Sequence, residues 1–123
     1  MLPIRGVYEV AINVRDLARA ESFYRQVLGL TVGIRDDERR RVFLRAGGQA
    51  GMIVLIEDKG DWPAQHLAFT VDAADIDAAA AALRRSGVEV EGPVTHDWMP
   101  AKSAYFFDPD GHQLELCAPL GES

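Results

Sequence analysis

The chain repeats one pattern of apolar strand and helix start at a long spacing. The segment EVAINV at residues 9–14 aligns with HLAFTV at 66–71, and GLTV at 29–32 aligns with GVEV at 87–90. The offset is 57 residues for the first match and 58 for the second. Two copies at this spacing indicate a duplicated supersecondary unit, because a solenoid needs three or more repeats.

Each copy predicts a strand, a helix and three further strands. Asp16 is expected to cap the first helix, and Gly29 and Gly87 are expected to end the two helices. The predicted segments are strands at 7–14, 30–34, 41–45 and 52–57 around a helix from residue 16, and strands at 66–71, 88–90, 103–107 and 113–117 around a helix at 75–85. The predicted fold class is α+β, with two βαβββ modules, curved mixed and mainly antiparallel sheets, and the helices outside.

Length and charge limit the organisation and the partners. The 123 residues suit a single domain, with one module at about 5–58, a linker at 59–64 and a second module at about 65–119. A net charge of -6 argues against nucleic-acid binding, and no apolar run approaches the roughly 20 residues of a membrane span. The single cysteine, Cys117, excludes an internal disulfide. We therefore expect a cytoplasmic protein with neither a nucleic-acid nor a membrane partner.

Strand alternation assigns the two faces of each predicted sheet. The faces expected under the helices carry large apolar residues: Val10, Ile12 and Val14 in the first module, and Leu67, Phe69, Val71, Leu114 and Leu116 in the second. The opposite faces carry Glu9, Ala11, Asn13, His66, Ala68, Thr70, Gln113, Glu115 and Cys117. Glu, His and Glu thus stand among small residues, which leaves room for a ligand.

Three segments carry a resemblance to a known family. They are RDLARAESFYRQVLGL at 15–30, QHLAFTV at 65–71 and FFDPDGHQLELCAP at 106–119. The chain resembles the vicinal oxygen chelate superfamily, which includes glyoxalases, bleomycin-resistance proteins and extradiol dioxygenases. The resemblance implies a divalent ion held by the first and last strands of the modules. By position its ligands would be Glu9, His66 and Glu115.

The family's remaining ligand position falls near Ile53 or Leu55, which cannot bind metal, and Glu57 has the same strand parity. Glu9 stands where the family usually has a His. Two carboxylates and one neutral imidazole would favour Mn²⁺ or Mg²⁺, with Zn²⁺, Ni²⁺ and Fe²⁺ left open, and they weaken the case for oxygen activation. The other interpretation is that Glu9 binds no metal and the protein has no cofactor.

Four further residues are candidates for substrate binding. Ser103 and Tyr105 share one strand face, and the matching positions of fosfomycin-resistance members contact substrate. Phe43 lies between two arginines of one strand, and Trp98 lies in the loop THDWMP, which suits either a lid or ordinary packing. His112, in the turn DPDGH, is expected to be structural.

Two functions follow from these residues. The first is a glyoxalase-like enzyme that uses a divalent metal as Lewis acid on an oxygen-chelating substrate, with Glu9 moving a proton. A lyase, an isomerase or an epoxide-opening transferase would fit, although the changed first ligand argues against full fosfomycin-type function. The alternative is a metal-free protein that binds a drug or metabolite, as bleomycin-resistance proteins do. Either would have a small-molecule ligand, and we expect a homodimer because short members of the family usually pair.

Overall fold

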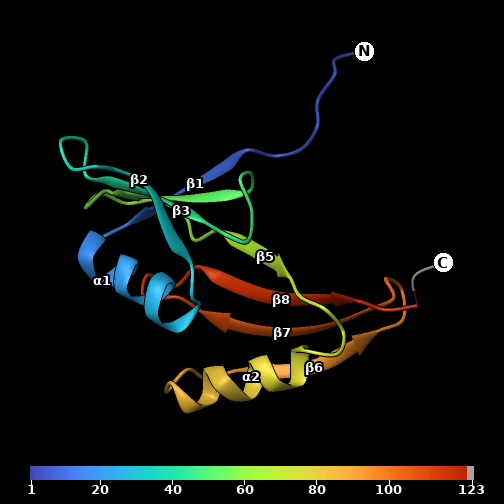
Figure 1. Ribbon diagram of the computed structural model, residues 1–123. Helices are drawn as coiled ribbons and strands as arrows, with labels where there is room; N and C mark the ends of the chain where they lie inside the picture. The colour runs from blue at the N-terminus through green and yellow to red at the C-terminus, as the bar shows by residue number, and fades with distance from the viewer. Residues whose placement is uncertain (122–123) are drawn as a thin grey trace. The chain divides into compact units, whose positions relative to one another are not determined.

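The computed structural model describes residues 1–121 and divides into two compact units, Met1–Pro63 and the chain from Ala64 onward (Figure 1). Unit 1 contains β1 (Glu9–Val14), α1 (Leu17–Ser22), the π-helical turn η1 (Phe23–Val27), β2 (Thr31–Asp36), β3 (Arg41–Arg45) and β4 (Met52–Glu57). Unit 2 contains β5 (His66–Thr70), α2 (Ile76–Arg85), β6 (Glu91–His96), β7 (Ala101–Phe107) and β8 (Gln113–Pro119). The predicted α+β class with two modules is confirmed.

Both sheets have the same mixed topology. Their strand orders are β1-β4-β3-β2 and β5-β8-β7-β6. The first pair in each sheet is parallel and the other two pairs are antiparallel. In each unit the first strand therefore lies beside the last, although the helix and two strands separate them in sequence.

The core of unit 1 lies between its helical segment and one face of its sheet. Asp16 caps α1 as predicted, since its carboxylate accepts a hydrogen bond from the Arg19 backbone N–H at 3.1 Å. Val10 keeps 38% of its surface exposed, so the prediction that it packs under the helix is wrong for this first position. The buried apolar residues of this core include Ile12, Val14, Leu17, Ala20, Tyr24, Val42, Leu44 and Leu55.

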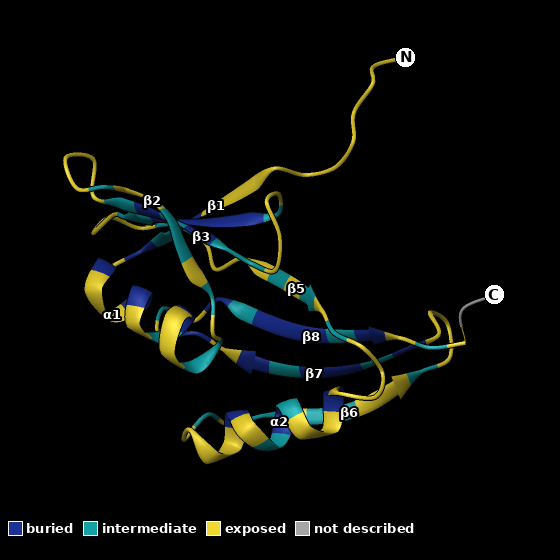
Figure 2. Ribbon diagram, viewed as in Figure 1, coloured by how far each residue is buried: buried dark blue, intermediate teal, exposed yellow. Residues whose placement is uncertain are grey.

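The core of unit 2 lies between α2 and the face of the sheet that it contacts through β6, β7 and β8. Figure 2 shows long buried stretches in β7 and β8. Apolar side chains fill this layer: Ile76, Ala80 and Leu83 from α2, with Ala104, Phe106, Leu114, Leu116 and Ala118 from the strands. No helix in residues 1–121 is long and apolar enough to cross a membrane.

The prediction for the third strand of unit 2 is wrong in its position. Residues 88–90 are not a strand, and β6 instead spans Glu91–His96, which lies outside the predicted strands. The register of β6 against β7 shifts between Glu91 and Val94, where Gly92 and Pro93 lie. Proline is tolerated there because β6 is an edge strand and the bulge needs no ladder hydrogen bond from it.

Candidate metal and substrate site in unit 2

The pairing of β5 with β8 brings His66 and Glu115 together. Ala68 pairs with Glu115 and His66 pairs with Gln113, so His66 and Glu115 are diagonal neighbours on one face of the sheet. The imidazole Nε2 lies 3.2 Å from the carboxylate Oε1. Two residues that are 49 positions apart in the chain thus converge at the centre of this face.

A hydrogen bond from a neighbouring serine fixes the orientation of the Glu115 carboxylate. Glu115 is only 7% exposed, and its Oε2 accepts a hydrogen bond of 2.7 Å from the hydroxyl of the fully buried Ser103. This leaves Oε1 aimed at His66, whose side chain is half exposed. The pair therefore presents one oxygen and one nitrogen at an accessible position, with the oxygen held rigidly.

The spacing of the pair fits two ligands of one divalent ion. Two donor atoms that each lie about 2.1 Å from a common ion are about 3.0 Å apart at a right angle and about 3.4 Å apart at a tetrahedral angle. The observed 3.2 Å falls between these limits. Carboxylate oxygen with neutral imidazole nitrogen is also an ordinary donor set for Mn²⁺, Zn²⁺, Ni²⁺ or Fe²⁺. The distance between the two side chains therefore suits two ligands of one metal ion as well as it suits a direct hydrogen bond or ion pair.

Glu9 occupies the place in unit 1 that His66 occupies in unit 2, because it pairs with the first residue of β4 as His66 pairs with the first residue of β8. Its side chain is exposed at the start of β1. Among residues 1–121, no three His, Cys, Asp or Glu side chains gather closely enough to hold an ion. The metal set of Glu9, His66 and Glu115 therefore remains a prediction.

The position in unit 1 that corresponds to Glu115 is Val54, which corrects the assignment to Ile53 or Leu55. Ala11 pairs with Val54 as Ala68 pairs with Glu115. Because a shift of one residue moves a side chain to the other face of a sheet, Ile53 and Leu55 point toward the helix side. The consequence for chemistry is unchanged, since valine also cannot bind metal.

Glu57 is held by hydrogen bonds from two residues of unit 1. Its Oε2 accepts the Leu17 backbone N–H at 3.0 Å, and the Arg40 guanidinium binds both of its oxygens at 3.1 and 3.2 Å. These bonds, led by that from Arg40, lower the pKa of Glu57 from 4.5 to about 2. This carboxylate links the start of α1 to the turn after β2, and it lies on the opposite face from Glu9.

Tyr105 lies on the same face as the His66–Glu115 pair. It pairs directly with Glu115, and its hydroxyl lies 3.0 Å from Nε2 of His96. His96 belongs to the segment THDWMP, for which the sequence predicts a loop, so this contact follows only from the register of β6. Trp98 is 80% exposed in the turn after β6, with its ring centroid 6.1 Å from that of His96. The two aromatic candidates of unit 2 are thus joined through one histidine.

Phe43, the remaining substrate-binding candidate, belongs to unit 1. It pairs with Val54 in β3, on the same face as Glu9. The Arg41 guanidinium carbon lies 5.4 Å from the centroid of its ring, and Arg41 also binds Asp36 at 3.0 Å. The role of Phe43 toward a substrate remains a prediction.

A cavity of about 260 Å³ lies beside the pair in unit 2. We call it the Tyr105 cavity, and its lining residues are Glu89, Val90, Glu91, Tyr105, Phe106, Phe107 and Gln113. Tyr105 and Gln113 are direct strand neighbours of Glu115 and His66 respectively. The cavity therefore continues the polar face on which the pair lies.

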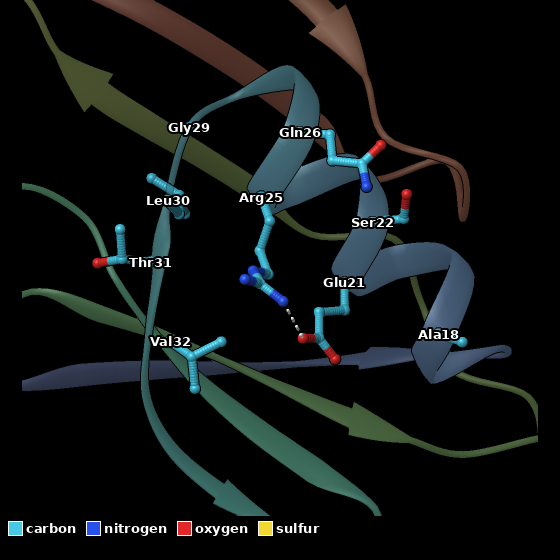
Figure 3. Close-up of a pocket in the computed structure, with 9 residues that line it drawn as sticks. All are labelled: Ala18, Glu21, Ser22, Arg25, Gln26, Gly29, Leu30, Thr31 and Val32. Carbon is cyan, nitrogen blue, oxygen red and sulfur yellow. Dashed lines mark hydrogen bonds and ion pairs between the residues drawn. The ribbon is translucent and has the colours of Figure 1, made fainter.

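A second cavity, of about 500 Å³, lies in unit 1 between α1, η1 and β2 (Figure 3). Glu21, only 8% exposed at its edge, binds Arg25 at 3.1 Å and forms a second ion pair with Arg35. Hydrogen bonding to Arg35 is the main cause that lowers the pKa of Glu21. The lining also includes Ser22, Gln26, Thr31 and Val32. No residue of the predicted site lies in this cavity, and its ion pairs tie the helix to β2.

Comparison with known proteins identifies the family. The family model of the Glyoxalase/Bleomycin resistance protein/Dioxygenase superfamily matches residues 6–116. This match covers both units and includes the His66–Glu115 pair. The chain belongs to this superfamily, as its resemblance to vicinal oxygen chelate proteins predicted.

Relatives within the family differ in what their names describe. Metallothiol transferase FosB of Staphylococcus saprophyticus is 26% identical over 120 residues, covering 92% of this chain and 76% of the relative. Among solved structures, integron cassette protein HFX_CASS4, from the mobile metagenome of Halifax Harbour Sewage Outfall, is 45% identical with a TM-score of 0.89, covering 94% of this chain and 99% of that one. TnmS3, an antibiotic binding protein from Streptomyces sp. CB03234, is 27% identical with a TM-score of 0.83, covering 97% and 99%.

Proposed function

We propose that this protein is a metal-dependent enzyme that transfers a thiol to a small electrophilic substrate. The substrate would chelate the ion through adjacent oxygens, as an epoxide with a neighbouring oxygen-bearing group can. The observation that carries the proposal is the convergence of His66 and Glu115 at 3.2 Å, with Ser103 holding the carboxylate. The family membership and the similarity to a metallothiol transferase support it. In the proposal, His66, Glu115 and Glu9 hold the ion.

The chain's own residues have separate tasks in this reaction. His66, Glu115 and Glu9 would hold an ion that, when bound, would supply Lewis acidity toward a substrate oxygen. Ser103 keeps Glu115 in one orientation, and the Tyr105 hydroxyl, held by His96, offers a hydrogen bond to a substrate on the same face. As sulfur bonds to carbon, the carbon–oxygen bond opens and its electron pair stays on oxygen. Glu9, through the carboxylate oxygen that does not bind the ion, would take the proton from the attacking thiol and return it to that alkoxide oxygen.

The second candidate function is a metal-free binding protein. The Tyr105 cavity, with two aromatic side chains and two carboxylates, is present beside the pair whether or not an ion binds. The similarity to an antibiotic binding protein of the same fold supports this candidate. In that case the His66–Glu115 contact would be a structural hydrogen bond or ion pair.

Calorimetric titration of chelator-stripped protein with Mn²⁺, Zn²⁺, Ni²⁺ and, without air, Fe²⁺ separates the two functions. We expect one ion to bind more tightly than micromolar, and Glu115→Gln to weaken it strongly. The matched control is Glu38→Gln, which removes a carboxylate from an exposed turn of unit 1. Loss of binding below about pH 6 would follow from protonation of a ligating imidazole. Failure of all four ions to bind more tightly than millimolar would reject the enzyme and favour the binding protein.

We also propose that the protein is a cytoplasmic homodimer. Each sheet has open edges at its first and fourth strands, and such edges are commonly covered in folded proteins. Light scattering at micromolar concentration should give about twice the chain mass of 13.5 kDa. A mass of one chain under these conditions would contradict the dimer.

A further inference from the structure

We infer that the Tyr105 cavity is a subsite for an organic cation, so that the preferred substrate carries an ammonium or similar group beside its chelating oxygens. The inference rests on the proposed function in one respect, because it takes the cation bound in the cavity to be part of the enzyme's substrate. The remainder of the argument depends on the cavity, its neighbours and their charges within unit 2.

The cavity is placed to receive the end of a molecule held at the pair. Two rows run across the sheet: Glu91, Tyr105 and Glu115 form the first, and Phe107, Gln113 and His66 the second. The first row runs from Glu91 at the cavity to Glu115, and the second runs from Phe107 at the cavity to His66. At about 260 Å³ the cavity is smaller than a pocket for a whole drug-sized ligand, and it suits one substituent of a molecule.

The residues that line the cavity include aromatic residues and two glutamates. Tyr105 is fixed by its hydrogen bond to His96, and Phe107 is 61% exposed although it lies in a strand of the sheet. An aromatic face attracts a cation by about 0.5–2 kcal/mol, and more strongly as water is excluded. The two glutamates, Glu89 and Glu91, add negative charge at the same cavity. An organic cation would be attracted both by the aromatic residues and by the glutamates of the cavity, whereas a phosphonate or carboxylate group would be repelled by the glutamates.

The two glutamates are not neutralised by a neighbouring side chain. Within the described part of the chain, the ion pairs join other acids to their partners and none includes Glu89 or Glu91. Arg84 of α2 lies beside this segment, and its guanidinium donates to the backbone carbonyls of Val90 and Gly92 at 2.9 and 2.6 Å. Lys102 is bound to Asp77 of α2. Two glutamate charges therefore stand against the one positive charge of Arg84 at this segment, which leaves a net negative charge.

The direct test uses metal-free protein and probes without chelating oxygens. Binding of 2-phenylethylammonium, 2-phenylethanol and 3-phenylpropionate is measured by NMR titration of the chelator-stripped protein. We expect the ammonium probe to bind at least about tenfold more tightly than the carboxylate probe. In Glu89→Gln/Glu91→Gln this preference should fall to within about twofold, while Glu38→Gln should keep it. Equal binding of the probes, no ammonium binding at tens of millimolar, or an unchanged preference in the double variant would overturn the inference.

A second set of probes distinguishes failure of the subsite from failure of the metal site. Dopamine, 4-ethylcatechol and 3,4-dihydroxyphenylpropionate share one pair of adjacent oxygens and differ in the charge of the side chain. With the ion bound, dopamine should bind most tightly. Equal, metal-dependent binding of all three would overturn the cation subsite and leave the metal proposal standing. An ammonium preference in the metal-free protein without any metal-dependent binding would support the subsite and reject the metal site.

Discussion

The two units share one topology but use their charged residues differently. Unit 1 joins its charges in ion pairs between elements: Arg25 and Arg35 with Glu21, Arg39 and Arg41 with Asp36, and Arg40 with Glu57. Unit 2 places His66 and Glu115 next to each other on its sheet and also joins Lys102 to Asp77. Where unit 2 has Glu115, unit 1 has the buried Val54. The same topology therefore holds a network of ion pairs in unit 1 and the proposed ligand site in unit 2.

This difference explains why the arginine-rich segment is not a binding patch. Between Arg35 and Arg41, four guanidinium groups are bound to acids of unit 1. Ion pairs at partly exposed positions add little each, but together they fix the hairpin and the helix. The site proposed in unit 2 depends instead on the buried carboxylate of Glu115, which Ser103 orients toward His66.

Exchanging the corresponding residues of the two units should have the largest effect. Glu115→Val should lower metal affinity more than about 100-fold, because losing a ligand exceeds the loss of an outer partner. It should cost only about 1 kcal/mol of stability, since a buried carboxylate is removed while the Ser103 hydroxyl loses its acceptor. Val54→Glu should cost about 3 kcal/mol because it buries a carboxylate among apolar neighbours. Calorimetric titration measures the metal affinity, and urea unfolding measures the stability of both variants. A Val54→Glu protein as stable as the parent would contradict the proposed difference between the two units.

Removing the support of Glu115 should have a smaller effect on the same site. Ser103→Ala deletes the donor at 2.7 Å, leaves the carboxylate free to turn, and should weaken metal binding about 10- to 100-fold. Ser22→Ala is the matched control in unit 1, since the Ser22 side chain makes no capping hydrogen bond. Isothermal titration of both variants makes the comparison. Unchanged affinity in Ser103→Ala would mean that Glu115 is held by the strand alone.

Strand alternation predicted the His66–Glu115 face because both of their strands alternate clearly between polar and apolar residues. It failed in β4, where MIVLIE is apolar almost throughout, so that only pairing with β1 identifies Val54 as the counterpart of Glu115. It also failed in β6, because Gly92 and Pro93 are typical of a loop and the bulge that accommodates them depends on the neighbouring strand. The His96–Tyr105 contact was missed for this second reason.

Acid should weaken the ion pair of Glu57 with Arg40 only at low pH. Its pKa is lowered to about 2 in the folded protein, so its contribution is complete above its ordinary value of 4.5 and is lost as the pH falls toward 2. Glu57→Gln should therefore lower the Tm at neutral pH, and the difference from the parent should shrink over this range. Unit 2 has Ala118 at the corresponding place and offers no such titration. Thermal unfolding at a series of pH values tests this. A difference in Tm that persists at pH 2 would assign the effect to packing rather than to the carboxylate.

The smallest expected difference concerns the two helix starts, which look alike in sequence. Asp16 accepts a hydrogen bond from the Arg19 N–H at 3.1 Å, whereas Asp75 at the start of α2 makes no side-chain capping bond. Asp16→Ala should thus cost about 1 kcal/mol, and Asp75→Ala only about 0.3 kcal/mol from the lost interaction with the helix dipole. Urea unfolding of the two variants gives both values. Asn at each position is the informative second variant, because Asp16→Asn keeps the cap and should recover most of the loss, while Asp75→Asn should match Asp75→Ala. Equal costs at the two positions would show that the helix starts of the two units are energetically equivalent despite their different hydrogen bonding.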